Sequence, residues 1–156
     1  MKWSEVIAEP TLRDLPFKIE LNEHGSIVMT PASNRHGLLQ VRLANRLSGM
    51  IPDGEAMVEC SIDTPKGVKV ADVAWLSAAF LAAHGDETPY TAAPELCIEV
   101  VSPTNSAAEI EEKKGLYFTQ GAREVWLCDE DGRVQFFTPD GPAGESRLFG
   151  AFPGQT

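Results

Sequence analysis

Hydrophobic residues follow two different periods along the chain, and each change of period marks a predicted element. Residues 18–21 and 27–29 are short β-prone runs on either side of an Asn-Glu-His-Gly segment, which predicts a β-hairpin. Ser33 or Asn34 can cap a helix that runs to about Met50, because leucines recur behind it at helical spacing. The first third of the chain is therefore expected to form a hairpin followed by a helix.

The remaining two thirds alternate between strand-like and helix-like patterns. Strands are predicted at residues 56–62, 68–76, 96–101, 124–128 and 133–138, with a helical turn at 78–83 and a helix from the capping box at Ser106 to about Gln120. The run 96–101 is almost wholly apolar, which is typical of a central strand covered on both faces. The tail beyond residue 138 is rich in Pro and Gly and is expected to be irregular.

The order of these elements predicts an α/β (α+β mixed) fold, in which helices flank a mixed β-sheet and a hairpin precedes it. The chain has 156 residues and no internal repeat, which is the size of one ordinary domain. We therefore expect a single domain, 1–156, with its core at about residues 18–138.

Two carboxylates interrupt the apolar strands and are the strongest candidates for chemistry. Asp72 lies within the run 68–76, and Glu99 lies within the run 96–101. A carboxylate in a covered strand is costly unless a cation lies beside it. Two of them in neighbouring strands could share one divalent ion, which prefers oxygen ligands. Either acid alone is more often a strand-end residue or an arginine partner, so the pair is more informative than its members.

The helix that follows Glu99 carries two lysines close to the same place. Lys113 and Lys114 flank the stripe of Ile110 and Tyr117 that should face the sheet. Either could be an ordinary surface lysine whose stem covers apolar surface. Periodicity alone does not decide which of them reaches back toward the Glu99 strand.

Charge and cysteine content limit the classes of function. The formal net charge is −10 and the pI is near 4.7, which opposes tight, nonspecific binding to DNA. A bound metal ion could still supply positive charge locally. The three cysteines are an odd number, each within an apolar run, and neither a secretory signal nor a membrane span is expected. The sequence therefore predicts a cytoplasmic protein without disulfides.

Several strings of residues resemble one known family. The Glu-Val-Val-Ser-Pro string from Glu99, the helical pair Lys113 and Tyr117, and the Arg-Glu-Val-Trp string at 123–126 are similar to the bacterial Uma-type restriction endonuclease family. That family belongs to the PD-(D/E)XK nuclease superfamily. The resemblance extends to the Val-Ala-Asp-Val-Ala string around Asp72 and covers nearly the whole domain. It implies a restriction-endonuclease-like core.

The resemblance also implies a role for each candidate residue. Asp72 and Glu99, together with the carbonyl of Val100, would hold Mg²⁺, for which Mn²⁺ can substitute. Lys113 would orient the attacking water or stabilise charge on the phosphorane-like transition state. Glu20 would add a metal contact or orient a water. The alternative, to which we give the same weight, is that Glu20 is an ordinary exposed strand glutamate.

This sequence departs from the superfamily pattern at two positions. Ala71 stands where a proline usually precedes the aspartate, and Val101 stands where the motif lysine would be. The resemblance implies that the lysine comes from the following helix instead. Counting back from Tyr117 places it at Lys113, which leaves Lys114 to solvent.

Three functional readings remain open. The first is a Mg²⁺-dependent endonuclease that hydrolyses phosphodiester bonds in DNA. The second is a catalytically weak or inactive nuclease-fold module that acts in binding or regulation, which the acidic charge and the lack of a Lys/Arg cluster favour. In the third, Asp72 and Glu99 belong only to a buried ion-pair network with Lys113 or Arg123.

The small size and limited basic surface suggest that two copies act together. A homodimer would let two sites address one duplex, and exposed Trp3 and Phe152 could serve such contacts.

Among the histidines, His36 lies near the start of a predicted helix and is more simply explained as a satisfied or solvent residue. His24 and His84 look like loop residues.

Overall fold

The structure is a computed structural model that describes all residues, 1–156. Its helices are α1 (Trp3–Ala8), the 3₁₀ helix η1 (Pro10–Leu12), α2 (Asn34–Ser48), α3 (Ala78–His84) and α4 (Ala107–Thr119). Its strands are β1 (Phe17–Leu21), β2 (Ile27–Pro31), β3 (Gly54–Thr64), β4 (Gly67–Ser77), β5 (Leu96–Val100), β6 (Glu124–Cys128), β7 (Val134–Thr138) and β8 (Gly141–Ala143). None of the helices combines the length and the apolar character that crossing a bilayer requires.

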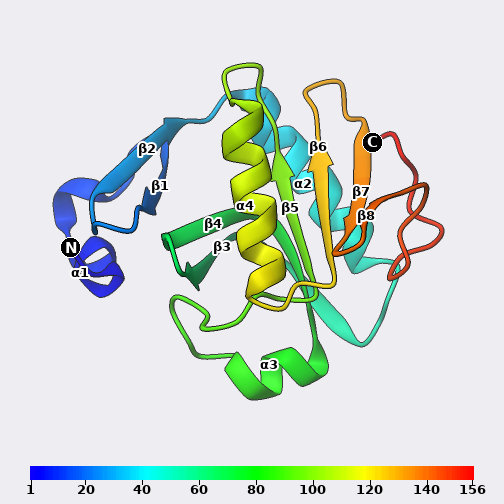
Figure 1. Cartoon of the computed structure of the whole chain (residues 1–156), viewed down its shortest axis with the longest axis horizontal. Helices are drawn as coiled ribbons and strands as arrows, with labels where there is room; N and C mark the ends of the chain where they lie inside the picture. The colour runs from blue at the N-terminus through cyan, green and yellow to red at the C-terminus, as the bar shows by residue number, and fades with distance from the viewer.

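A mixed six-stranded sheet in the order β3-β4-β5-β6-β7-β8 forms the centre of the molecule. Only β5 and β6 run parallel, and α4 makes the crossover between them. The hairpin β1-β2 forms a separate two-stranded sheet. Figure 1 shows α4 in front of the sheet, α2 behind it, and the hairpin with α1 at one side. The predicted mixed sheet with flanking helices and an N-terminal hairpin is confirmed.

The two faces of the sheet carry separate hydrophobic cores. Behind the sheet, Leu39, Leu43 and Leu47 of α2 are fully buried, as their spacing of four residues predicts. In front, Tyr117 of α4 is fully buried within a second cluster that includes Cys97. Burial on both sides explains why β5 is apolar apart from its one carboxylate.

Both long helices begin where the sequence predicts, because each has a serine cap. The hydroxyl of Ser33 accepts a hydrogen bond from the backbone N–H of His36 (3.1 Å) at the start of α2. Ser106 and Glu109 form a reciprocal capping box at the start of α4. These caps set the positions from which α2 and α4 present their side chains to the sheet.

The two ends of the chain are more ordered than the sequence predicts. Trp3 is buried with Leu21 in a small third cluster that attaches α1 to the hairpin. Phe152 is also buried, with its ring centroid 4.6 Å from that of Trp126. The prediction that Trp3 and Phe152 are exposed contact residues is therefore wrong. The tail beyond residue 138 contains β8 and contributes to the core, so it is not simply irregular.

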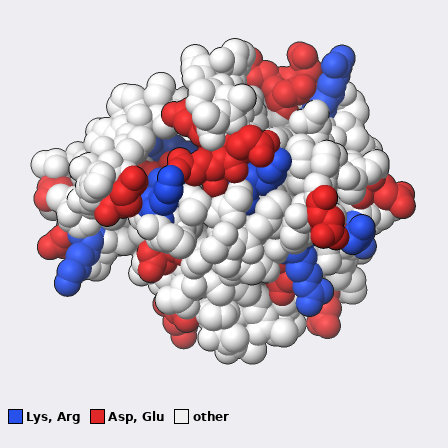
Figure 2. Space-filling view, viewed as in Figure 1, with Lys and Arg blue, Asp and Glu red and all other residues white.

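The surface shows no single basic region on the face in Figure 2. Acidic atoms form a band across the middle of this face, over α4, and the Lys and Arg atoms are scattered. This distribution agrees with the net charge of −10. A nucleic acid approaching this face would meet mostly negative charge.

Candidate active site

Asp72 and Glu99 stand at the point where two neighbouring strands separate. Strands β4 and β5 pair in antiparallel register up to Val73 and Ile98, and the two acids are the next residues along each strand. The carboxylate of Asp72 accepts a hydrogen bond from the backbone N–H of Val100 (Oδ2 to N, 2.7 Å). The side chain thus continues the link between the strands where the backbone ladder ends.

Lys18 of β1 lies between the two acids. Its Nζ is 2.9 Å from Asp72 Oδ1 and 3.0 Å from Glu99 Oε2, so one ammonium bridges both carboxylates. The same Nζ is 4.0 Å from Glu20 Oε1. The hairpin therefore inserts a cation into the position on which the two acids converge.

Glu99 is held by two groups from α4. The hydroxyl of Tyr117 donates a hydrogen bond to Glu99 Oε1 (2.6 Å), and Lys113 Nζ lies 3.4 Å from the same oxygen. Tyr117 and Lys113 are four residues apart and so lie on one face of the helix. The predicted choice of Lys113 as the lysine that reaches the Glu99 strand agrees with this geometry.

Glu20 positions Lys113. One carboxylate oxygen, Oε1, accepts a hydrogen bond from the backbone N–H of Val70 (2.8 Å) and lies 2.6 Å from Lys113 Nζ. The side chain of Glu20 is nearly buried. Lys18 lies two residues earlier in β1, so its side chain is on the same face of the strand. Glu20 therefore fixes the position of an amine as well as linking the hairpin to β4.

His36 approaches Asp72 from the first turn of α2. Its Nε2 is 3.1 Å from Asp72 Oδ1, the oxygen that also contacts Lys18. The hydrogen bond to Asp72 raises the pKa of His36, and partial burial opposes that shift only in part. Of the two alternatives expected for His36, a satisfied or a solvent histidine, the structure shows the first, because His36 is hydrogen-bonded within the polar cluster.

The environments of the two acids push their pKa values in opposite directions. Burial favours the neutral form of Asp72, but the ammonium of Lys18 and the hydrogen bond from His36 outweigh burial and hold its pKa below the ordinary value. Burial raises the pKa of Glu99, and the neighbouring Lys113 and Lys18 oppose that rise without cancelling it. Such a split between adjacent carboxylates is common at functional sites.

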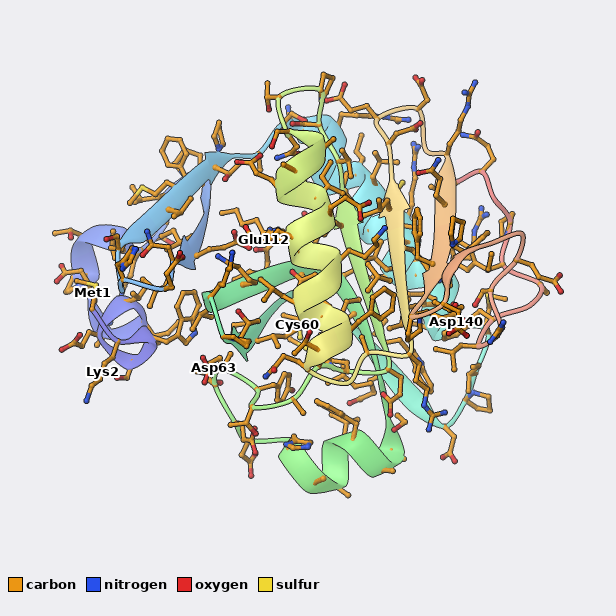
Figure 3. All side chains as sticks on the ribbon, viewed as in Figure 1. Met1, Lys2, Cys60, Asp63, Glu112 and Asp140 are labelled. Atoms are coloured by element: carbon orange, nitrogen blue, oxygen red, sulfur yellow. The ribbon has the colours of Figure 1, made fainter.

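The cluster opens into a cavity of about 430 Å³. Its walls are formed by the segment between β2 and α2, by the loop that follows β5, and by the polar cluster itself. The lining residues that bear on chemistry are Lys18, His36, Asp72, Glu99, Val100 and Lys113. Figure 3 shows side chains filling the space between the hairpin and α4, with Glu112 on the side of α4 nearer the hairpin. The two acids therefore line a cavity that a ligand could enter.

Other sequence predictions near the site have different outcomes. Lys114 was expected in solvent, but it lies over the ring of Phe137 (3.9 Å to the centroid) and pairs with Glu111 (2.8 Å). Arg123, the other partner considered for the acids, forms no ion pair in the structure. Lys18 was not predicted at all, although alternation does place it on the same face of the strand as Glu20.

The donor set suits a hard divalent cation. Mg²⁺ is typically held by one or two carboxylates and completes its shell with water and substrate phosphate. Asp72 and Glu99 supply two carboxylates that already share one cation, the ammonium of Lys18. No three side chains among His, Cys, Asp and Glu form a ready-made metal cage. The residues therefore fit a cation bound mainly through two acids, and they do not fit a closed structural metal site.

Comparisons with known proteins agree with this geometry. The family model Uma2, described as "Putative restriction endonuclease", matches residues 10–155. Among solved structures, the chain is similar to a protein from Anabaena variabilis titled as a "putative nuclease belonging to DUF820", with a TM-score of 0.70 and 17% sequence identity. The similarity covers 89% of this chain and 80% of that one, and it concerns the fold. No curated protein matches the chain.

Proposed function

Since the chain belongs to the Uma2 family, we propose that it is a Mg²⁺-dependent endonuclease that hydrolyses phosphodiester bonds in DNA. The observation that carries the proposal is that Asp72, Glu99 and Lys113, from two strands and one helix, line the same cavity, with Lys113 Nζ 3.4 Å from Glu99 Oε1. These three residues combine the groups that metal-assisted phosphodiester hydrolysis needs.

Different residues of the chain would have different roles in this reaction. Asp72, Glu99 and the carbonyl of Val100 would hold Mg²⁺, which when bound lowers the pKa of a coordinated water and polarises a phosphate oxygen. Lys113 Nζ would orient the attacking water or stabilise negative charge that develops on the phosphate. Glu20 holds Lys113 in place through its 2.6 Å contact.

Two further residues position the acids. Tyr117 fixes one oxygen of Glu99 through its hydrogen bond, which leaves the second oxygen, Oε2, for a cation. Burial raises the pKa of the Tyr117 phenol well above its ordinary value, so this residue remains a proton donor at neutral pH. His36 similarly holds Oδ1 of Asp72. In this role both are positioning residues.

The net charge favours a second candidate, a nuclease-fold module with weak or no catalysis that acts in binding or regulation. The chain carries a charge of −10, which disfavours tight binding to a polyanion. A variant of Lys113 distinguishes the two proposals, because only the nuclease requires this amine for its activity.

We propose further that the chain acts as a homodimer in the cytoplasm. Two copies would place two cavities along one duplex, which the small basic surface of a single copy makes advantageous. The three cysteines are free and buried, as a reducing compartment favours. Light scattering tests the dimer, because a monomer at micromolar concentration would contradict it.

The experiment that tests the function is a cleavage assay with a matched pair of lysine variants. Plasmid and linear duplex DNA are incubated with the wild type, Lys113→Ala and Lys114→Ala in Mg²⁺ or Mn²⁺ at low salt. The nuclease proposal predicts cleavage by the wild type and by Lys114→Ala, and a loss of at least about 100-fold in Lys113→Ala. Cleavage that survives equally in both variants, or its absence from the wild type under all conditions, would contradict it.

A further inference from the structure

Lys18 is the cation nearest to both acids, and nothing in the proposed chemistry uses it. Its Nζ lies 2.9 Å from Asp72 Oδ1 and 3.0 Å from Glu99 Oε2. Its side chain is only about one tenth exposed. An ammonium so placed satisfies the two oxygens that a divalent cation would use.

The charge count of the cluster makes this position important. Three carboxylates, those of Asp72, Glu99 and Glu20, face the two ammonium groups of Lys18 and Lys113. One negative charge is therefore left over when His36 is neutral. A divalent cation that entered while Lys18 stayed would reverse the sign of the cluster and place two cations in contact, which is strongly unfavourable at low dielectric.

We propose that the ammonium of Lys18 is the resident counter-ion of this site and that it competes with the divalent cation for the position between Asp72 and Glu99. The inference rests on the proposed metal-dependent function and adds a residue that sets the metal affinity. Lys18 keeps the buried acids paired while the protein is metal-free, and metal binding requires its ammonium to leave.

The ammonium of Lys18 can leave its position between the two acids without detaching the hairpin. Lys18 belongs to the two-stranded sheet β1-β2, which forms no backbone ladder with the six-stranded sheet. Glu20 links the hairpin to β4 through the backbone N–H of Val70, and the α1 cluster packs beside it. A lysine stem has four rotatable bonds, so the ammonium can withdraw into the cavity that it lines while the hairpin remains attached.

The test is Mn²⁺ titration by calorimetry of the metal-free full-length protein and of three variants. Lys18→Met removes the competing charge, Lys18→Arg retains it, and Lys66→Met removes a lysine that is half exposed and paired with Glu112. We expect Lys18→Met to bind Mn²⁺ at least about tenfold more tightly than the wild type. Lys18→Arg and Lys66→Met should stay within about threefold of the wild type, since neither changes the charge next to the acids.

Thermal unfolding supplies a second measurement. Without metal, Lys18→Met removes the ammonium that Asp72 and Glu99 share and leaves Asp72 with no lysine partner, so the variant should unfold at a lower temperature than the wild type. Mn²⁺ should raise its Tm by more than that of the wild type, and should restore folding if the metal-free variant is unfolded. Lys18→Gln keeps a neutral hydrogen-bond donor. Like Lys18→Met, it should have a lower Tm than the wild type without metal and a larger increase in Tm with Mn²⁺.

The outcomes separate this inference from the proposed function. If the wild type binds Mn²⁺ and Lys18→Met binds it no more tightly, Lys18 is a permanent structural ion-pair partner and the competition is refuted, while the metal site stands. If neither the wild type nor Lys18→Met binds Mn²⁺, the metal-dependent function fails and the competition fails with it.

Discussion

The phenol of Tyr117 and the carboxylate of Glu99 are joined by a 2.6 Å hydrogen bond in which both side chains are buried. The bond connects the last turn of α4 to the end of β5, and it assigns different roles to the two oxygens of Glu99. Oε1 faces Tyr117 and Lys113, whereas Oε2 faces Lys18 and the place proposed for a metal ion.

Removing that hydroxyl should weaken both the fold and the site. Tyr117→Phe leaves the ring in the core but deprives Glu99 of a donor, which should cost about 1–3 kcal/mol of unfolding free energy. Cleavage should fall by about tenfold, because Glu99 is less firmly oriented. Urea denaturation and the DNA assay measure the two effects. Unchanged stability together with unchanged cleavage would show that the bond has no such role.

Glu20 should act through Lys113. Glu20→Gln keeps an oxygen for the N–H of Val70 but weakens the contact with the amine, so kcat should fall by about tenfold while KM changes little. Glu23→Gln, in the exposed hairpin turn, is the matched control and should behave as the wild type. Steady-state kinetics on a short duplex measures both parameters. A rise in KM with kcat unchanged would instead assign Glu20 to substrate binding.

The His36–Asp72 contact should make the stability of the metal-free protein depend on pH. The pKa of His36 is raised in the folded state, so the stabilisation is fully present below the unfolded value of about 6.5 and is lost as pH rises through the folded pKa. His36→Asn should remove this part of the pH dependence, whereas His24→Asn, an exposed turn variant, should retain it. Denaturation in EDTA between pH 6 and 9 provides the measurement. Parallel curves for the wild type and His36→Asn would contradict the assignment.

The C-terminal tail should contribute strongly to stability. Phe149 is 2% exposed and packs edge-on against Trp75 (5.3 Å between centroids) and Trp126 (5.9 Å). Phe149→Ala should therefore cost about 3–5 kcal/mol. Phe17→Ala removes a ring that is 40% exposed and should cost about 1 kcal/mol or less. Equal losses in the two variants by urea denaturation would show that the tail does not belong to the core.

The sequence predicted those parts of the site that break a local pattern. Asp72 and Glu99 were detectable because a charge inside an apolar strand is costly. Lys113 could be separated from Lys114 only through the family resemblance, since both flank the same helical stripe. The long helices were predictable from their serine caps and leucine spacing.

Lys18 escaped prediction because its partners lie 54 and 81 residues away. In a short strand of mixed polarity a lysine is ordinary, and local pattern does not reveal where a hairpin packs. The packing depends on Trp3 and Val6 against Leu21, a contact between a helix that was not predicted and a strand that was. The order of the tail is hard to predict for a related reason, because Pro and Gly indicate irregular backbone but do not indicate whether the aromatic residues among them are buried.

A crystal structure of the wild type soaked in Mn²⁺, with the ion located by its anomalous signal, tests most directly whether Asp72 and Glu99 hold a metal ion. We expect a peak between the carboxylates of Asp72 and Glu99, with Lys18 Nζ withdrawn from both. The absence of a peak at this position, with Lys18 still bridging the two acids at saturating Mn²⁺, would contradict it.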